Sequence, residues 1–318
     1  MKRITRLTAA LGCVATLALT ACATNAGSTP SLGAAPQSRI ASIAGPGWIQ
    51  KDGIVYHIPH YMATREMAAR QAKPPPTTFS YYGGVVLTAP HVYLIFWGYD
   101  TYGDKKSVQP LMTAYIGAMG GSGHNNIYTQ YYEKSGSTTT YITNPSQQLG
   151  GTWNDDQHAV PAHPSDAQVA QEAVYGVSHF GYDPNGSYVV ATPHNHSTNG
   201  FGTQWCAYHS ATVSGGNLVS YTNMPYAPDA GSSCGASIIH HPSDEKAIDE
   251  GVTIIEGHEE GESVTDPNPG AGWYNYTYGE IGDICAWKNI ANDTFGTASY
   301  TMQPMFSNAT QSCVHTYN

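Results

Sequence analysis

Short, continuous apolar runs alternate along this chain with amphipathic stretches of helical length. The runs Val92–Trp97 (VYLIFW) and Tyr188–Ala191 (YVVA) have the length of strands and contain no charged position. Such runs are typical of strands that are buried on both faces of a sheet. Residues 85–87 and 218–222 are weaker strand candidates.

The spacing of the remaining apolar positions predicts helices over 108–119, 167–179 and 245–263. Ser165 is placed to cap the second of these helices, and Gly181 follows its end. Strands that alternate with helices indicate an α/β or α+β domain, in which helices pack on a layered mixed sheet.

The first residues have the pattern of an export signal. Three basic residues precede an apolar stretch, Leu7–Thr20, that is too short to span a membrane. We predict a signal peptide over residues 1–21, of the lipoprotein type because Leu19–Cys22 (LTAC) resembles a bacterial lipobox, with Cys22 lipidated. An ordinary secretory signal is the alternative. Either way the chain is expected to be exported, as a lipoprotein anchored to the membrane (periplasmic or at the cell surface) or as a secreted protein.

The segment between the signal and the main domain has a different composition. Residues 22–76 are expected to hold a tether, small and polar up to about residue 45, and an amphipathic stretch over 61–72 that is a candidate pro-segment or lid. The run Pro74–Pro76 separates this stretch from residues 77–318, which are expected to form a single globular domain.

Four cysteines remain after the signal and the lipobox. In an oxidising compartment they predict two disulfides, for which three pairings exist. We favour Cys206–Cys234 and Cys285–Cys313, because both close local loops. No C-x-x-C pair is present, so a metal site made of thiols is a poor alternative.

The charge balance excludes one class of partner. The whole chain carries a formal charge of −10, and −13 without the three basic residues of the signal, while only 11% of residues are charged. Nucleic acid is not expected as a partner, because no basic patch is present to neutralise phosphates.

The most informative stretch is 256–262 (EGHEEGE), which carries H-E-x-x-E inside the last predicted helix. This is a carboxylate variant of the H-E-x-x-H pattern of zinc hydrolases. At about 100° per residue, His258 and Glu262 project within about 40° of each other on the apolar side of the helix. Burying them without a partner is expensive, and Zn²⁺ is a suitable partner, with Glu259 beside it as general base. Glu256 and Glu260 are expected to face solvent. The alternative is a buried His–Glu hydrogen bond that orients the helix.

Two glycines lie one turn apart in the same helix. Gly257 and Gly261 each cost about 1 kcal/mol relative to Ala in a helix interior. We therefore expect a strand, another helix or a substrate to approach the backbone closely at these positions.

A zinc site with two helical ligands needs a third ligand from elsewhere. Glu280 and Asp283 are the candidates, and Glu280 ranks slightly higher; the other would accept a hydrogen bond from His258. A less favoured reading is a structural Ca²⁺ ion bound by the oxygens of Asp266-x-Asn268-x-Gly270.

Two other patterns carry less weight. Residues 231–235 (GSSCG) fit G-x-S-x-G, but a nucleophile elbow needs a buried strand before it and a helix after it, and neither is expected here. His194, His196 and His209 could each face a cleft, although exposed turn histidines are more common.

Several segments together resemble a known family. They are 81–87 (YYGGVVL), 92–98 (VYLIFWG), the HExxE helix with Thr265–Pro267, Trp273–Tyr274 and 280–285 (EIGDIC). The chain is similar from about residue 80 to 318 to uncharacterised secreted bacterial proteins and to the plant phosphate-induced, EXORDIUM-like family of cell-wall proteins. The resemblance implies an extracellular or wall-associated role. This chain departs from the family in having Glu260 and Gly261 where relatives tend to have an apolar or aromatic residue and Ala.

The sequence thus predicts an exported zinc-dependent hydrolase with a zincin-like helix, and a metallopeptidase in particular. His258 and Glu262 would bind zinc with Glu280 or Asp283, and Glu259 would move the proton. The substrate would be a peptide or a cell-wall polymer, and the lipid would be the only membrane contact. The main alternative is a non-catalytic lipoprotein that binds wall glycans at the cell surface, in which the same helix is structural.

Overall fold

The computed structural model describes residues 46–71 and 78–318. The predicted signal peptide, the lipidation site at Cys22 and the tether up to residue 45 lie outside the described residues, as do residues 72–77. Within the described part, no helix is both long enough and apolar enough to cross a membrane.

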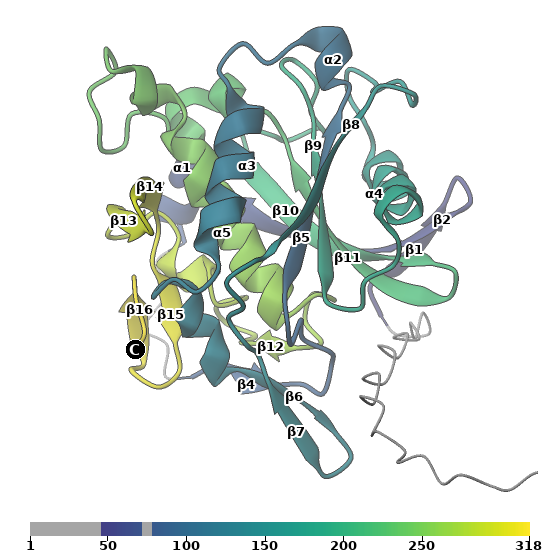
Figure 1. Ribbon diagram of the computed structural model, residues 1–318, viewed down its shortest axis with the longest axis vertical. Helices are drawn as coiled ribbons and strands as arrows, with labels where there is room; N and C mark the ends of the chain where they lie inside the picture. Colours follow the sequence, from purple (N-terminus) through teal and green to yellow (C-terminus); the bar gives the residue numbers. More distant parts are fainter. Residues whose placement is uncertain (1–45, 72–77) are drawn as a thin grey trace, which may run out of the picture. The chain divides into compact units, whose positions relative to one another are not determined.

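A mixed sheet forms the centre of the fold. Its strands are β1 (Trp48–Lys51), β2 (Ile54–His57), β3 (His60–Ala63), β5 (His91–Trp97), β8 (Leu149–Asp155), β9 (Gly186–Ala191), β10 (Trp205–Ser214) and β11 (Asn217–Met224). They lie in the order β1-β2-β10-β11-β9-β5-β8, and β3 also pairs with β10 (Figure 1). The strands β11, β9, β5 and β8 run parallel to one another, whereas β10 pairs antiparallel with β11, β2 and β3.

Helices cover both faces of this sheet. The helices α3 (Val108–Met119) and α5 (Glu250–Thr265) lie on one face and α4 (Asp166–Phe180) on the other (Figure 1). The alternation along β5 explains how one strand serves both cores: Leu94 and Phe96 pack with α3 and α5, and Ile95 and Trp97 pack with α4. The predicted layered arrangement of helices on a mixed sheet is confirmed.

Most of the predicted elements are present. The helix α3 has the predicted bounds, and α4 begins at a capping box between Ser165 and Gln168 and ends at Gly181. The helix α5 begins five residues later than predicted, because residues 245–248 form a separate 3-10 turn. Residues 85–87 are not a strand, so that prediction was wrong.

The globular part begins earlier than the predicted boundary at residue 77. The strands β1, β2 and β3 belong to the central sheet, and the short helix α1 (Arg65–Ala69) follows them. Removal of residues 46–76 as a pro-segment would therefore take three strands out of the sheet.

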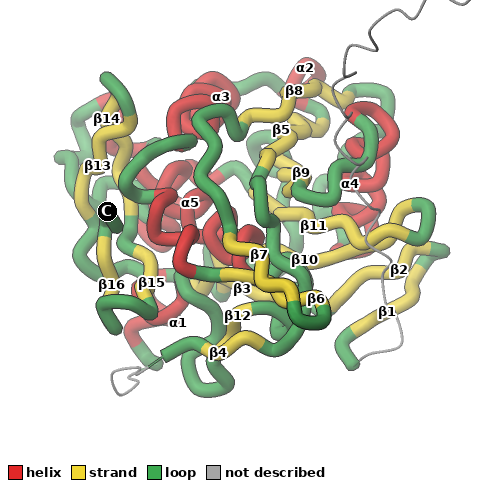
Figure 2. Tube along the Cα trace, turned by 60° about the horizontal axis from the view of Figure 1, so that its bottom comes forward, coloured by secondary structure: helices red, strands yellow, loops and turns green. Residues whose placement is uncertain are grey.

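Small hairpins and turns complete the fold. The C-terminal hairpins β13/β14 and β15/β16 lie beside α5 (Figures 1 and 2). Both predicted disulfides, Cys206–Cys234 and Cys285–Cys313, are present. The remaining elements are α2 (Tyr99–Tyr102), β4 (Ser80–Tyr81), β6 (Tyr132–Ser135), β7 (Thr138–Tyr141), β12 (Trp273–Tyr274), β13 (Ala291–Phe295), β14 (Ala298–Met302), β15 (Met305–Ser307), β16 (Ser312–Val314) and the 3-10 turns η1 (Asn125–Gln130), η2 (Ala227–Cys234), η3 (Glu245–Ile248) and η4 (Asp283–Cys285).

Candidate metal centre

The helix α5 is buried along its whole length of 16 residues, although it contains five glutamates. It packs against β10 and β11 of the sheet, against α3 and against β14. On the side toward β10, His258 Nε2 lies 3.2 Å from Glu262 Oε1. His258 and Glu262 therefore lie next to each other, as predicted.

The other side of the helix differs from the prediction. Glu256 and Glu260 were expected to face solvent, but each is only 1% exposed. Burial raises the pKa of Glu256 to about 8, with a smaller contribution from Glu259, and raises that of Glu260 well above its usual range. The prediction was wrong because the fold also covers this side: Tyr115 of α3 lies near both carboxyls and Ser187 of β9 lies near Glu260, and the pattern within the helix does not show that cover.

Close packing explains the two glycines of α5. A Cβ at Gly257 would lie 2.4 Å from Met302 Cε, and a Cβ at Gly261 would lie 2.4 Å from Met305 Cε. The expected close approach to the helix backbone is confirmed, and it is made by the C-terminal strands β14 and β15.

Two histidines from the sheet complete the cluster around α5. His209 of β10 and His60 of β3 are directly paired across the antiparallel ladder, so their side chains lie on the same face. His209 Nδ1 lies 3.2 Å from Glu259 Oε2 and 3.6 Å from Glu262 Oε2. The sequence marked His209 as one of several cleft candidates and gave no signal for His60.

The loop after α5 brings in both predicted third ligands. Glu280 Oε2 lies 3.1 Å from His209 Nε2 and 3.9 Å from His60 Nε2. Asp283 Oδ2 lies 2.7 Å from His60 Nε2, and its other oxygen lies 4.0 Å from His258 Nε2. Ligand atoms can therefore converge in three overlapping groups that share Glu262, each with its atoms within 4.8 Å of one another. These groups are His258–Glu259–Glu262, His209–Glu262–Glu280 and His60–Glu262–Asp283.

Glycine is required where the loop meets the helix. A Cβ at Gly282 would lie 2.8 Å from both Glu262 Oε1 and His258 Nδ1, and a Cβ at Gly279 would lie 1.9 Å from Asp283 Oδ2. Gly279 also has a φ of +88°, which L-residues rarely adopt. These two glycines let the loop backbone approach the buried ligands.

The carboxylates of the cluster need positive charge between them, and its histidines can carry part of it: against the effect of burial, Glu262 raises the pKa of His258 to about 9 and Asp283 raises that of His60 to about 10. Burial raises the pKa of Glu280 well above its usual range, and the Asp266 and Glu262 carboxylates add to this rise. Burial also raises the pKa of Glu259, against the opposing hydrogen bond with His209. Carboxylates that are buried this close together cannot all ionise without a cation or protons between them.

Many atoms of the cluster have no hydrogen-bond partner within the described residues. They are His209 Nε2, His258 Nε2, Glu259 Oε1, Glu262 Oε2 and both side-chain oxygens of Glu280. Buried polar atoms are nearly always paired, so such a concentration points to a ligand or to water between them. Two imidazole nitrogens with carboxylate oxygens are a donor set that suits Zn²⁺.

The orientation of Gln303 bears on this assignment. Its Nε2 lies 3.0 Å from His258 Nδ1 and 3.1 Å from the carbonyl oxygen of Gly282, whereas its Oε1 has no hydrogen-bond partner in the described part of the chain. In this orientation Gln303 donates to Nδ1, and the proton of a neutral His258 is on Nε2, where it points toward Glu262. A metal on Nε2 requires the proton on Nδ1, so Gln303 must then turn its free oxygen toward the ring.

Asp266 shapes the loop between the helix and Glu280. Its two oxygens accept hydrogen bonds from the backbone N–H groups of Gly270, Ala271 and Gly272, at 2.6, 3.1 and 2.6 Å. A calcium ion on these oxygens would compete with the three donors, and the calcium site stays a prediction.

A cavity of about 280 Å³ adjoins the cluster. His60 and Asp283 line it, and these two residues also contact the buried ligands. Four tyrosines are among the other residues that line it: Tyr61, Tyr274, Tyr276 and Tyr278. The His60–Asp283 pair therefore lies between the cavity and the fully buried side chains of α5.

The other sequence patterns do not form a comparable site. Residues 227–234 are a 3-10 turn, and Cys234 is in a disulfide, so the nucleophile elbow is absent. His194 binds Asp229 near the surface, and His196 bonds to a backbone carbonyl.

The comparisons with known proteins found no matching family model, no matching curated protein and no matching solved structure. The resemblance to the EXORDIUM-like family therefore stays a prediction.

Proposed function

We propose that this protein is an exported zinc-dependent hydrolase that acts on peptide bonds. One observation carries the proposal: two histidines and three glutamates converge in the interior, and six of their polar atoms have no hydrogen-bond partner within the described residues. His258 and Glu262 would hold the ion with a third ligand. His209 is the best placed for this role, because it approaches both Glu262 and Glu280. Export is supported by the two disulfides, which persist in oxidising compartments.

The chemistry follows from the side chains around this position. Zn²⁺ would supply a Lewis acid that polarises the scissile carbonyl and makes water a better nucleophile at neutral pH. Glu259 would accept the proton of the attacking water and transfer it to the leaving amine. Its Oε2 lies 3.2 Å from His209 Nδ1, and its Oε1, which has no hydrogen-bond partner among the described residues, would take this proton.

The cavity next to the cluster gives a route for the substrate. A peptide lying along Tyr274 and Tyr276 would reach the His60–Asp283 pair first. These two side chains are 20% and 17% exposed, and the atoms beyond them are fully buried. The pair must therefore separate before a substrate carbonyl can reach the ligands of α5.

The test is the pair of substitutions Glu259→Gln and Glu260→Gln in the purified protein. Glu259→Gln should retain zinc and lose hydrolysis of a peptide library, because only the proton acceptor is removed. Glu260→Gln makes the same chemical change at the next position, on the covered side of the helix, and should keep both properties. Unchanged hydrolysis in Glu259→Gln would refute the mechanism, and wild-type protein without zinc would refute the site.

The aromatic wall of the cavity favours a second candidate, a non-catalytic protein that binds wall glycans. Tyr82 and Tyr276 are exposed, and their rings lie 5.1 Å apart beside this opening. Aromatic faces of this kind can stack on sugar rings. Retention of the protein on wall polysaccharide in the presence of a chelator, with no hydrolysis under any condition, would support this function over the first.

A further inference from the structure

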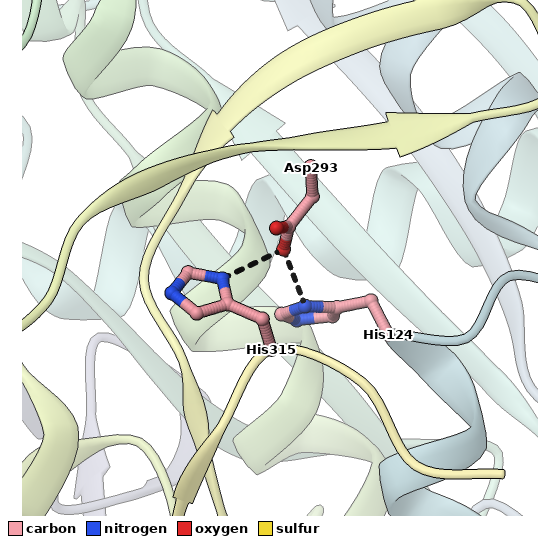
Figure 3. A group of neighbouring side chains, drawn as sticks. All are labelled: His124, Asp293 and His315. Carbon is pink, nitrogen blue, oxygen red and sulfur yellow. Dashed lines mark hydrogen bonds and ion pairs between the residues drawn. The ribbon is translucent and has the colours of Figure 1, made fainter.

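A second group of possible metal ligands lies apart from the α5 cluster. His124 precedes η1, Asp293 is in the middle of β13, and His315 follows β16. These positions are far apart in the sequence, yet their ligand atoms all lie within 4.8 Å of one another. Figure 3 shows both imidazoles approaching the same oxygen of Asp293.

The contacts of His315 fix which of its nitrogens carries a proton. Nε2 lies 2.7 Å from the carbonyl oxygen of Asn289. A carbonyl only accepts, so Nε2 donates, and in a neutral ring Nδ1 must then present a lone pair. That lone pair lies 2.9 Å from Asp293 Oδ2. Two acceptors at this distance need a positive charge between them.

The contacts of His124 extend the argument. Its Nδ1 lies 3.2 Å from the same oxygen, Asp293 Oδ2, and its Nε2 has no partner within the described residues. The side chain is only 1% exposed, so this buried imidazole makes its hydrogen bond with Asp293 alone. With protons on both Nδ1 atoms the two contacts are hydrogen bonds to Asp293, whereas a metal ion would take both imidazole lone pairs and the carboxylate together.

We propose that His124, Asp293 and His315 form a structural Zn²⁺ site that fastens the C-terminal segment to the body of the protein. Two imidazoles and one carboxylate suit Zn²⁺ better than Ca²⁺ or Mg²⁺, which prefer oxygen ligands. Zn²⁺ bonds of about 2.0–2.1 Å in a tetrahedron hold the ligand atoms about 3.3 Å apart. The separations of 2.9 and 3.2 Å are close to that spacing.

The surroundings match such a role. The bond from His315 Nε2 to a backbone carbonyl is the kind of outer contact that orients a metal-binding imidazole. Asp293 and His315 are partly exposed, which leaves a fourth position open to water. Next to the site, the backbone N–H of Tyr317 donates to the carbonyl oxygen of Gly123, so the C-terminal segment already runs beside His124.

The experiment is zinc stoichiometry by native mass spectrometry on the purified full chain. The variants are His315→Gln, Asp293→Asn, His258→Ala and the double variant His258→Ala/His315→Gln. The control is His91→Ala, because His91 binds Asp183 at 2.7 Å with no second histidine. We expect two ions in the wild type and in the control, one in each of the three single variants and none in the double variant.

The result separates this site from the proposed hydrolase site. One ion that is lost in His315→Gln and kept in His258→Ala would support the structural site and refute the hydrolase site. Zinc in His315→Gln and Asp293→Asn equal to that of the wild type would overturn the structural site. Zinc should also raise the melting temperature of His258→Ala and leave that of the double variant unchanged. Because His258→Ala keeps all three proposed ligands of this site, the effect of zinc on its melting temperature tests the site even if the His315 variants fold poorly.

Discussion

A buried carboxyl on α4 gives a quantitative prediction for stability. Glu172 is 1% exposed, and it lies beside Asp155 at the end of β8. Burial, with a smaller contribution from the Asp155 carboxylate, raises the pKa of Glu172 from its ordinary value of 4.5 to about 9. The folded protein therefore keeps this carboxyl protonated at pH values where the unfolded chain has released the proton.

The sign and size of the effect follow from proton linkage. Below pH 4.5 the carboxyl is protonated in both states and makes no contribution that depends on pH. Above pH 4.5 unfolding releases a proton, so stability falls as the pH rises until about pH 9. At about 1.4 kcal/mol per pH unit, the penalty is about 3 kcal/mol at pH 7 and about 1 kcal/mol at pH 5.

The substitution Glu172→Gln should remove this penalty, because the amide stays neutral and can still donate to Asp155. We expect the variant to be more stable than the wild type by up to about 3 kcal/mol at pH 7, and the gain to shrink toward pH 5. Urea denaturation of both proteins at several pH values measures this difference in the free energy of unfolding. Glu66→Gln, the same change at an exposed position of α1, is the control and should leave the profile unaltered. Parallel profiles for Glu172→Gln and wild type would refute the reasoning, and a variant that loses stability at high pH would show that Glu172 is ionised and paired with a cation.

Three further predictions test the site and the packing around it. Gln303→Glu should tighten zinc binding about tenfold in a chelator competition, because a carboxylate accepts a hydrogen bond from the Nδ1 proton of His258. Gln303→Leu should weaken zinc binding, and equal zinc affinities of both variants and the wild type would contradict His258 as a ligand. Replacing Cys285 and Cys313 by Ser should lower the free energy of unfolding by about 3–4 kcal/mol, since that bond closes a loop across a separation of 28 residues, and an unchanged denaturation midpoint would contradict it. Gly251→Ala should lower the free energy of unfolding by at least about 3 kcal/mol, because its Cβ would lie 1.9 Å from a backbone carbonyl oxygen. Gly117→Ala, whose Cβ would have its nearest neighbour at 3.9 Å, should raise the free energy of unfolding by up to about 1 kcal/mol in the same assay.

Local patterns predicted the elements of the fold well. The apolar runs at β5 and β9 and the capped helix α4 depend on interactions between residues close in sequence, so their positions can be read from the chain. The disulfide pairing also followed from short loops. The N-terminal strands were missed because β1 to β3 are short strands of mixed composition, and the pairing of β2 and β3 with β10 is a tertiary contact.

The sequence predicted only those site residues that lie close together in one helix or one loop. The spacing of H-E-x-x-E placed His258 and Glu262 together, and a short loop limited the partners to Glu280 and Asp283. His60 joins them through a strand pairing with His209, 149 positions away in the sequence, which no local pattern indicates. The cover over Glu256 and Glu260 is equally non-local, because Tyr115 of α3 and Ser187 of β9, both far away in the sequence, provide part of it.

The helix α5 shows how the fold and the chemistry depend on the same electrostatics. A helix with five glutamates is buried completely only if each carboxyl is neutral or paired. On the side of α3 the structure favours protonated Glu256 and Glu260, since burial there raises their pKa values. On the side of β10, Glu259 and Glu262 lie instead among three histidines. The imidazole nitrogens there can carry protons or can bind a metal ion through their lone pairs. The same helix thus has two different buried environments. Only the glutamates that face the histidines of the sheet can bind a metal ion or exchange a proton with an imidazole.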